Sequence, residues 1–154
     1  INTWLNGDFF NSLGSVEQSV IKQVKIPYCV GNLTSTINSG TNGLAVKAFL
    51  LGGYEVGFTI DDDNTLPEDG AKLDYFILGT NGNTKRISYL DGDAVYWWLR
   101  SPQWRTVNLV FHVKAAGGLT NQDPTRSKDG IRPALVLPGN ALFDETTMLL
   151  KGVK

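Results

Sequence analysis

Glycine beside a second turn-forming residue is the feature that most constrains how this chain can fold. Glycine accounts for 17 of 154 residues. The turn pairs are Asn6-Gly7, Asn42-Gly43, Gly52-Gly53, Asp69-Gly70, Asn81-Gly82, Asp91-Gly92, Gly117-Gly118 and Asp129-Gly130. Such pairs supply the positive φ angles that tight turns need. We therefore expect mostly short strands and loops, with few helices.

Size and composition fit one globular domain over 1–154. A hydrophobic share of 42% with 19% charged residues excludes a disordered or collagen-like chain. The net charge of −1 gives no electrostatic basis for binding nucleic acid, and no apolar run approaches the ~20 residues that span a bilayer. We therefore expect neither nucleic acid nor membrane insertion. Because the chain begins with Ile1 rather than Met, we expect a module of a longer protein.

The sequence offers few residues for catalysis. Cys29 is the single cysteine, so it forms no internal disulfide, and a small buried hydrophobe is its expected role. His112, the single histidine, lies in an alternating apolar stretch, where a structural histidine is favoured over a base or ligand. No phosphate loop, dinucleotide fingerprint or Gly-x-Ser-x-Gly elbow is present. We expect a protein that is not an enzyme and needs no cofactor.

Carboxylates gather between Asp61 and Asp69. Hard cations bind several carboxylate oxygens, so this segment raises the hypothesis of a calcium site. Its spacing does not match an EF-hand loop. A solvated acidic turn is the favoured interpretation, with calcium as the alternative, and we expect no metal site.

Three helices are predicted. Apolar residues at helical spacing predict the first over 3–10. Ser15 and Gln18 form a capping box for the second helix, which Pro27 ends. The third is predicted over 71–78.

Strands follow the helices. They are predicted over 48–51, 85–90, 95–99, 107–114 and 131–137. Pro133 requires an edge or a bulge, because proline cannot donate to a sheet ladder. The polar stretch 31–43 is expected to be an exposed loop. Helices followed by strands indicate an α+β fold.

Two motifs stand out in the second half of the chain. They are Tyr96-Trp97-Trp98-Leu99-Arg100-Ser101-Pro102 and Gly130-Ile131-Arg132-Pro133-Ala134-Leu135. Adjacent tryptophans on a strand point to opposite faces, so one fills the core while the other covers a second layer or forms a binding platform. Arg100 and Arg132 are placed to hydrogen-bond loop carbonyls or carboxylates. The expected scaffold residues are Trp97, Trp98, Leu99, Arg100 and Arg132.

These motifs, with the opening Thr3-Trp4-Leu5-Asn6 and Phe9-Phe10, resemble a domain family without an assigned function in Gram-positive gut bacteria and their phages. Phe49-Leu50-Leu51 and Gly53-Tyr54-Glu55 also fit, so the resemblance covers nearly the whole chain. Members are similar to C-type-lectin-like and formylglycine-generating-enzyme folds. This implies two or three helices around a small twisted antiparallel sheet, with much ordered loop. In phage tail or virion proteins such domains often precede immunoglobulin-like modules, which implies that 138–154 is an exit segment.

The resemblance also implies a display face. Some C-type-lectin-like relatives are targets of diversity-generating retroelements, which vary residues on one face over a constant scaffold. Here 103–129, between the two motifs, would form that face. The ligand-binding residues would be Gln103, Trp104, Arg105, Asn108, Leu109, Phe111, His112, Lys114, Asn121, Asp123 and Arg126. The alternative is that Trp104 and Phe111 are core and the rest ordinary loop.

The implied function is recognition. The domain would bind a protein or glycan on a bacterial surface as part of a phage tail, virion or cell-surface protein, next to other virion proteins or modules of the same chain. A purely structural module is the alternative, and an enzyme of the formylglycine-generating type the third. The Glu-Pro-Asn and Trp-Asn-Asp calcium motifs of C-type lectins are absent, as are the active-site cysteines of that enzyme group. Neither activity is therefore carried over.

Overall fold

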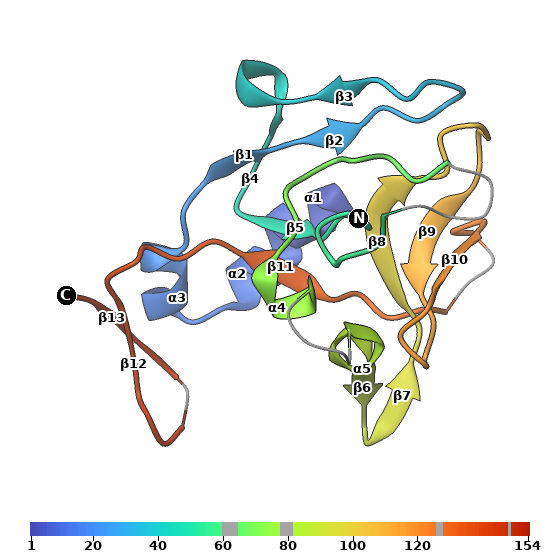
Figure 1. The fold of residues 1–154 in the computed structure, drawn as a ribbon. Helices are drawn as coiled ribbons and strands as arrows, with labels where there is room; N and C mark the ends of the chain where they lie inside the picture. The colour runs from blue at the N-terminus through green and yellow to red at the C-terminus, as the bar shows by residue number, and fades with distance from the viewer. Residues whose placement is uncertain (60–64, 78–81, 126–127, 148) are drawn as a thin grey trace.

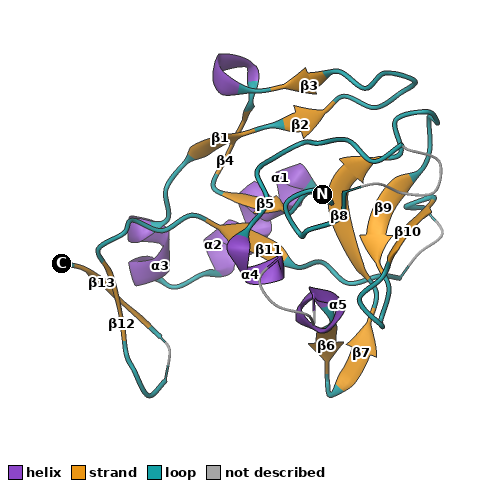
Figure 2. Cartoon of the chain, in the orientation of Figure 1, coloured by secondary structure: helices purple, strands orange, loops and turns teal. Residues whose placement is uncertain are grey.

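The computed structural model describes residues 1–59, 65–77, 82–125, 128–147 and 149–154, and it shows a mixed α+β protein of short elements (Figures 1 and 2). The helical segments are α1 (Asn2–Trp4), η1 (Leu5–Phe9), α2 (Phe10–Ser12), α3 (Ser15–Val20), η2 (Gly40–Asn42), α4 (Asp74–Ile77) and α5 (Gly82–Arg86). The strands are β1 (Val24–Ile26), β2 (Tyr28–Cys29), β3 (Ile37–Asn38), β4 (Leu44–Val46), β5 (Ala48–Leu50), β6 (Ser88–Leu90), β7 (Asp93–Val95), β8 (Trp97–Pro102), β9 (Val110–Val113), β10 (Leu119–Gln122), β11 (Pro133–Leu135), β12 (Ala141–Phe143) and β13 (Leu150–Val153). No helix within these ranges is long and apolar enough to cross a membrane.

The strands pair antiparallel in one three-stranded sheet and several two-stranded ones. In the three-stranded sheet, β9 lies between β8 and β10. The two-stranded sheets are β1–β4, β2–β3, β5–β11, β6–β7 and β12–β13. Figure 1 shows β8, β9 and β10 on one side of the molecule and the β12–β13 hairpin projecting on the other. The α+β class predicted from the sequence is confirmed.

The N-terminal helix is confirmed, because α1, η1 and α2 follow one another without a break over 2–12. The pair Asn6-Gly7 lies inside this helix, so the tight turn predicted there is wrong. Asn6 instead fastens the helix to β5. Its Oδ1 accepts hydrogen bonds from the N–H groups of Lys47 (2.7 Å) and Ala48 (3.1 Å), and its Nδ2 donates to the Ala48 carbonyl (2.8 Å). Tertiary contacts thus override the local turn preference of the pair.

The second predicted helix is much shorter than expected. α3 ends at Val20, and Val24 belongs to β1, which pairs with β4. The capping box is also wrong, because Gly14 caps the helix without a side-chain bond and Gln18 donates to the Leu13 carbonyl (2.7 Å). β-Branched residues prefer strands, and Val24, which continues the helical spacing, pairs with Val46 of β4 instead.

Other predicted elements are confirmed in part. The strand at 48–51 is β5, and Pro133 lies in β11, which pairs with β5 at a sheet edge as proline requires. The segment 85–90 begins in α5, and its end alone forms β6. The third helix is reduced to α4, and 78–81 lie outside the described residues. The loop predicted over 31–43 contains β3 and η2.

Two glycine pairs form the tight turns that the sequence predicts. Asp91 (φ 52°) and Gly92 (φ 93°) both have left-handed backbone and join β6 to β7. Gly117 (φ 81°) lies in the turn between β9 and β10, where an added Cβ atom would be 1.9 Å from the carbonyl oxygen of Asn83. Glycine is required at this turn, because both the backbone angle and the approach of α5 exclude a side chain.

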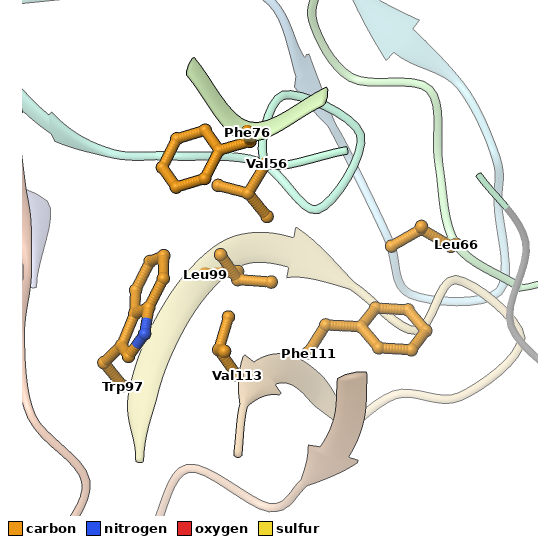
Figure 3. Packing of buried hydrophobic residues seen from close by; sticks show 7 residues of the cluster. All are labelled: Val56, Leu66, Phe76, Trp97, Leu99, Phe111 and Val113. Atoms are coloured by element: carbon orange, nitrogen blue, oxygen red, sulfur yellow. The ribbon is translucent and has the colours of Figure 1, made fainter. Parts of the chain in front are cut away.

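Two clusters of buried apolar side chains form the core, and β8 contributes one tryptophan to each. The larger cluster contains Trp97 with Val56, Leu66, Phe76, Leu99, Phe111 and Val113 (Figure 3). The smaller cluster contains Trp98 with Leu5, Ala48 and Leu50. Successive strand residues point to opposite faces, so the sheet turns one face to each cluster. The predicted separation of the two tryptophans is confirmed.

Arg100 of β8 connects several separate stretches of chain. Its Nη1 and Nη2 donate to the Glu55 carboxylate at 2.6 and 2.8 Å, and its Nε donates to the Pro27 carbonyl at 3.0 Å. Nη1 also donates to the Leu50 carbonyl at 2.9 Å, and Nη2 donates to the Asp69 carbonyl. The prediction that this arginine binds loop carbonyls and carboxylates is confirmed, and its bonds hold three distant segments against β8.

The Asp69 carboxyl group lies beside Arg100 and is fully buried. The Ser101 hydroxyl donates to its two oxygens, at 2.8 and 2.9 Å, and accepts a hydrogen bond from the Gly53 N–H at 2.8 Å. Burial raises the pKa of Asp69 to about 6, although the neighbouring Arg100 acts in the opposite direction. The folded protein therefore holds this proton over a pH range in which the unfolded chain has lost it.

Asp69 is expected to make the protein less stable at neutral than at acidic pH. Between pH 3.8 and about 6 the unfolded chain releases the proton while the folded protein keeps it, so the free energy of unfolding falls as the pH rises. The loss is on the order of 3 kcal/mol. Asp69→Asn should remove most of it, because asparagine stays neutral. Urea denaturation of both proteins at pH 4 and pH 7 measures the difference.

Asp144→Asn is the matched control for that experiment. The half-buried Asp144 carboxylate pairs with Lys151 (2.8 Å) and accepts hydrogen bonds from the N–H groups of Thr147 and Thr146, which lowers its pKa to about 2. Its replacement should leave the pH dependence between pH 4 and pH 7 unchanged. If the free energy of unfolding falls by the same amount from pH 4 to pH 7 in wild type and in Asp69→Asn, Asp69 does not keep its proton in the folded state.

Trp98→Ala is expected to lower the free energy of unfolding by about 3–5 kcal/mol, because it empties the smaller cluster. Tyr89→Ala removes an exposed aromatic side chain of β6 and should change the same quantity by less than about 0.5 kcal/mol. Chemical denaturation measures both variants. A loss for Trp98→Ala as small as that of Tyr89→Ala would contradict its assignment to the core.

Candidate functional site

The segment 103–129 forms the β8–β9 loop, β9, the next turn, β10 and the chain that leads to the second motif. Its predicted ligand-binding residues differ in exposure. Three are buried (Gln103, Phe111 and His112), and four are half-buried (Trp104, Leu109, Asn121 and Asp123). Three are exposed (Arg105, Asn108 and Lys114). Arg126 lies outside the described residues. The segment therefore divides into a part that supports the fold and a part that faces solvent.

Phe111 is a core residue, and its assignment to the ligand-binding set is corrected. Its ring is 1% exposed and packs in the larger cluster with Trp97 and Leu99 (Figure 3). The cause is the alternation along β9, which turns Phe111 and Val113 to this cluster and His112 to the opposite face. The alternative that Phe111 belongs to the core is thus the correct one.

The β8–β9 loop places an arginine and a tryptophan at the surface. Gln103 closes the loop, because its N–H donates to the Leu109 carbonyl (2.9 Å) and its carbonyl accepts from the Thr106 N–H (3.0 Å). The Gln103 side chain is buried, and its Oε1 has no hydrogen-bond partner among the described residues, so its ligand-binding role stays a prediction. The Arg105 guanidinium lies 4.8 Å from the centroid of the half-buried Trp104 ring. These two side chains form a cation–π pair.

The sheet face opposite the larger cluster contains a polar hollow, which we call the sheet pocket. It has a volume of about 290 Å³ and is lined by Tyr96, His112, Lys114, Thr120, Gln122 and Asp129. His112 pairs in the sheet with Trp98 on β8 and Thr120 on β10. Alternate positions of adjacent strands face the same side, and this brings the lining residues of β9 and β10 together.

His112 is the buried centre of the sheet pocket, with 3% of its surface exposed. Its ring stacks on Trp98 with centroids 4.9 Å apart and lies 5.4 Å from the ring of Tyr96. Nδ1 bonds to the Asp129 carboxylate, and Nε2 is buried without a hydrogen-bond partner among the described residues. A buried polar atom without a partner is rare, and it indicates a place for a water molecule or a ligand.

Backbone pairing between the second motif and β8 positions Asp129. The Gly130 N–H donates to the Tyr96 carbonyl (2.8 Å), and the Gly130 carbonyl accepts from the Trp98 N–H (3.0 Å). An added Cβ atom at Gly130 would lie 3.3 Å from the Tyr96 carbonyl oxygen, so glycine permits this close approach. The neighbouring Asp129 is thereby held where its carboxylate meets His112.

Sequence reasoning found two residues of the sheet pocket and missed the others. It proposed His112 and Lys114, but not Tyr96, Thr120, Gln122 or Asp129. Continuing the alternation of β9 through the Gly117-Gly118 turn indicates Thr120 and Gln122. Asp129 has no such signal, because its position depends on pairing with a strand distant in sequence.

Arg132 packs differently from the prediction. Its guanidinium lies over the rings of Trp97 (5.0 Å) and Phe76 (5.8 Å), and its Nη1 is buried without a hydrogen-bond partner in the part of the chain that the structure describes. It therefore contributes to the larger cluster by stacking on aromatic faces. The predicted bonds from Arg132 to loop carbonyls or carboxylates are not seen there.

Cys29 and Asp69, the other candidates for a reactive or metal-binding role, make contacts that stabilise the fold. The Cys29 thiol is buried, donates to the Thr34 carbonyl (3.6 Å) and has a pKa raised by burial, all properties of an unreactive thiol. Asp69 is committed to the Arg100 bonds, and 60–64 lie outside the described residues. Across the described ranges, no group of three His, Cys, Asp or Glu side chains is arranged to hold a metal ion.

The division of the 103–129 segment predicts opposite effects for two substitutions. Phe111→Ala should lower the free energy of unfolding by about 3–5 kcal/mol, because the ring fills the larger cluster. Arg105→Ala removes an exposed side chain and should cost less than about 0.5 kcal/mol. Thermal and urea denaturation compare the two. Equal losses would mean that the β8–β9 loop is as much a part of the core as β9.

Residues 1–139 match a family described as a domain of unknown function, DUF6273. The match includes both motifs and every element from α1 to β11, and it stops before the β12–β13 hairpin. No curated protein and no solved structure matches the chain. Because the match spans most of its length, this protein belongs to the DUF6273 family.

Proposed function

We propose that this domain is a ligand-recognition module with a C-type-lectin-like architecture, carried by a phage tail, virion or cell-surface protein. It binds a protein or a glycan on a bacterial surface through the solvent-facing part of 103–129 and the adjoining sheet pocket. The resemblance of the two motifs to domains of phage virion proteins supports the setting. The small antiparallel sheet with much surrounding loop is compatible with the architecture.

The sheet pocket is the observation that carries this proposal. The side chains of Tyr96, Lys114, Thr120 and Gln122 line it and make no hydrogen bond or ion pair within the described ranges. Together with His112 Nε2 they present donors and acceptors that water or a ligand must satisfy. A few convergent polar groups beside an aromatic ring are the groups that fix the orientation of a bound ligand.

A rigid base under the pocket supports recognition. His112 stacks on Trp98, which is itself buried in the smaller cluster, and Arg100 fixes the same strand to three other segments. Side chains held on strands of a locked scaffold keep their geometry better than side chains on free loops. The base of the pocket, formed by His112 on Trp98, therefore loses little conformational entropy when a ligand binds.

Binding fits this site better than catalysis. An aspartate–histidine pair activates a nucleophile when the free histidine nitrogen bonds to a hydroxyl or thiol. Here no described hydroxyl or thiol bonds to His112 Nε2. Cys29, the single thiol, is bound to the Thr34 carbonyl.

A structural role in assembly is the second candidate, and the C-terminal hairpin favours it. Leu142, Phe143 and Leu149 expose apolar side chains on β12–β13 or the turn between them. The hairpin lies beyond the part of the chain that matches the family and projects away from the β8–β10 sheet (Figure 1). Exposed apolar side chains gathered on one element are typical of a contact with another protein or module.

Binding of purified domain to bacterial cells tests the recognition function. Wild type should adsorb to cells of its host, and Trp104→Ala and Arg105→Ala should each lower the adsorbed amount at least about tenfold, since a few aromatic and arginine anchors carry most of the energy of an interface. Melting temperatures should stay close to wild type.

Leu142→Ser with Phe143→Ser is the matched comparison, because it changes exposed residues of the hairpin. It should leave adsorption unchanged. Loss of adsorption in this double variant, with none in Trp104→Ala or Arg105→Ala, would favour the assembly role instead.

A further inference from the structure

Lys114 is the charged group of the sheet pocket that has no charged or hydrogen-bonding partner among the described residues. The sequence contains no Asp or Glu between Asp93 and Asp123, so β8, β9 and β10 carry no carboxylate. Asp129 is the acid of the pocket, and its carboxylate bonds to His112 Nδ1. Lys114 is exposed at the pocket and pairs with no carboxylate in the described structure. The charge left without a partner in this hollow is therefore a cation.

The neutral groups of the pocket suit hydroxyl groups. The Thr120 hydroxyl and the Gln122 amide each combine a donor with an acceptor, and neither side chain has a partner within the described ranges. His112 Nε2 is a further polar atom in need of one. A ligand whose hydroxyl groups both donate and accept satisfies such a set.

Tyr96 adds a flat apolar surface. Its side chain is 41% exposed, lines the pocket and lies next to the His112 ring. An exposed aromatic ring beside polar groups accommodates the C–H face of a pyranose, while the hydroxyl groups at the edge of the sugar reach the polar side chains. The volume of about 290 Å³ lies at the lower end of the range for ligand pockets, so it suits one ring rather than an extended chain.

We propose that the sheet pocket binds a single acidic sugar residue, with the sugar carboxylate on Lys114, the ring against Tyr96 and hydroxyl groups on Thr120 and Gln122. This names the ligand chemistry of the site in the proposed recognition function and rests on that function for its biological setting. The same chemistry is offered by a free uronic acid and by a uronic acid at the end of a glycan.

Titration of the ¹⁵N-labelled domain with glucuronate, glucose, acetate and inorganic phosphate tests this proposal by NMR. Glucuronate should shift the resonances of Tyr96, His112 and Thr120 with a dissociation constant on the order of millimolar. Glucose lacks the carboxylate and acetate lacks the ring, so each should bind at least about tenfold more weakly. Phosphate should be as weak as acetate.

Two pairs of variants locate the contacts. Lys114→Gln should weaken glucuronate binding about tenfold and bring it near to that of glucose, while Lys22→Gln, at an exposed lysine outside the pocket, should leave it unchanged. Tyr96→Leu should weaken glucuronate and glucose alike, and Tyr89→Leu neither. Melting curves confirm that each variant is folded.

Several outcomes would overturn the proposal. If glucuronate and glucose bind equally well, the ligand carboxylate makes no contact that matters for affinity. If phosphate or acetate binds as tightly as glucuronate, the site does not recognise a sugar ring. If no ligand shifts the pocket resonances while the domain still adsorbs to cells, the sugar assignment is wrong and the recognition function stands. If glucuronate binds as expected and no cells are bound, the recognition function is wrong and the sugar site stands. Adsorption outcompeted by a glucuronate-ended oligosaccharide, but not by free glucuronate, identifies a glycan end as the source.

Discussion

The bonds of Arg100 hold together parts of the chain that have little regular structure of their own. Helices and strands here are short, and most sheets have two strands, so few backbone ladders connect distant segments. Arg100 replaces such ladders, because its guanidinium binds the carbonyls of Pro27, Leu50 and Asp69 and the carboxylate of Glu55. The planar guanidinium donates several hydrogen bonds in fixed directions from one buried position, whereas the single ammonium group of a lysine has no such fixed geometry. The rest of the fold is arranged around that point.

The strand that carries Arg100 also organises the core and the candidate site. Because neighbouring residues of β8 face opposite sides, Trp97 and Trp98 fill different clusters. Trp98 then provides the surface on which His112 stacks, and the backbone of the same strand binds Gly130 and so brings Asp129 to His112. The pocket therefore depends on β8, although no side chain of β8 lines it. Tyr96, the residue just before the strand, does line it.

The sequence predicts those features that depend on neighbours along the chain. The period of two on β8 correctly separates Trp97 from Trp98, and the Asp91-Gly92 pair correctly predicts a turn. Features set by distant partners are not predicted. Asn6 bonds to the start of β5 and keeps its glycine neighbour in a helix, and Val24 pairs with β4 although its spacing favours a helix. In both cases a contact more than 20 residues away decides the conformation.

The candidate site shows the same limit in a sharper form. A surface segment between two scaffold motifs was predicted as a continuous display face, but strands that cover a core must bury alternate residues. Phe111 and Val113 therefore stabilise the larger cluster while His112 between them faces the sheet pocket. Within 103–129, the substitutions that preserve the fold are therefore expected at every second position of β9 and β10 and in the β8–β9 loop. In the recognition function that we propose, Lys114, Thr120 and Gln122 are the positions at which a substitution would change the ligand, because their side chains make no hydrogen bond or ion pair in the described structure.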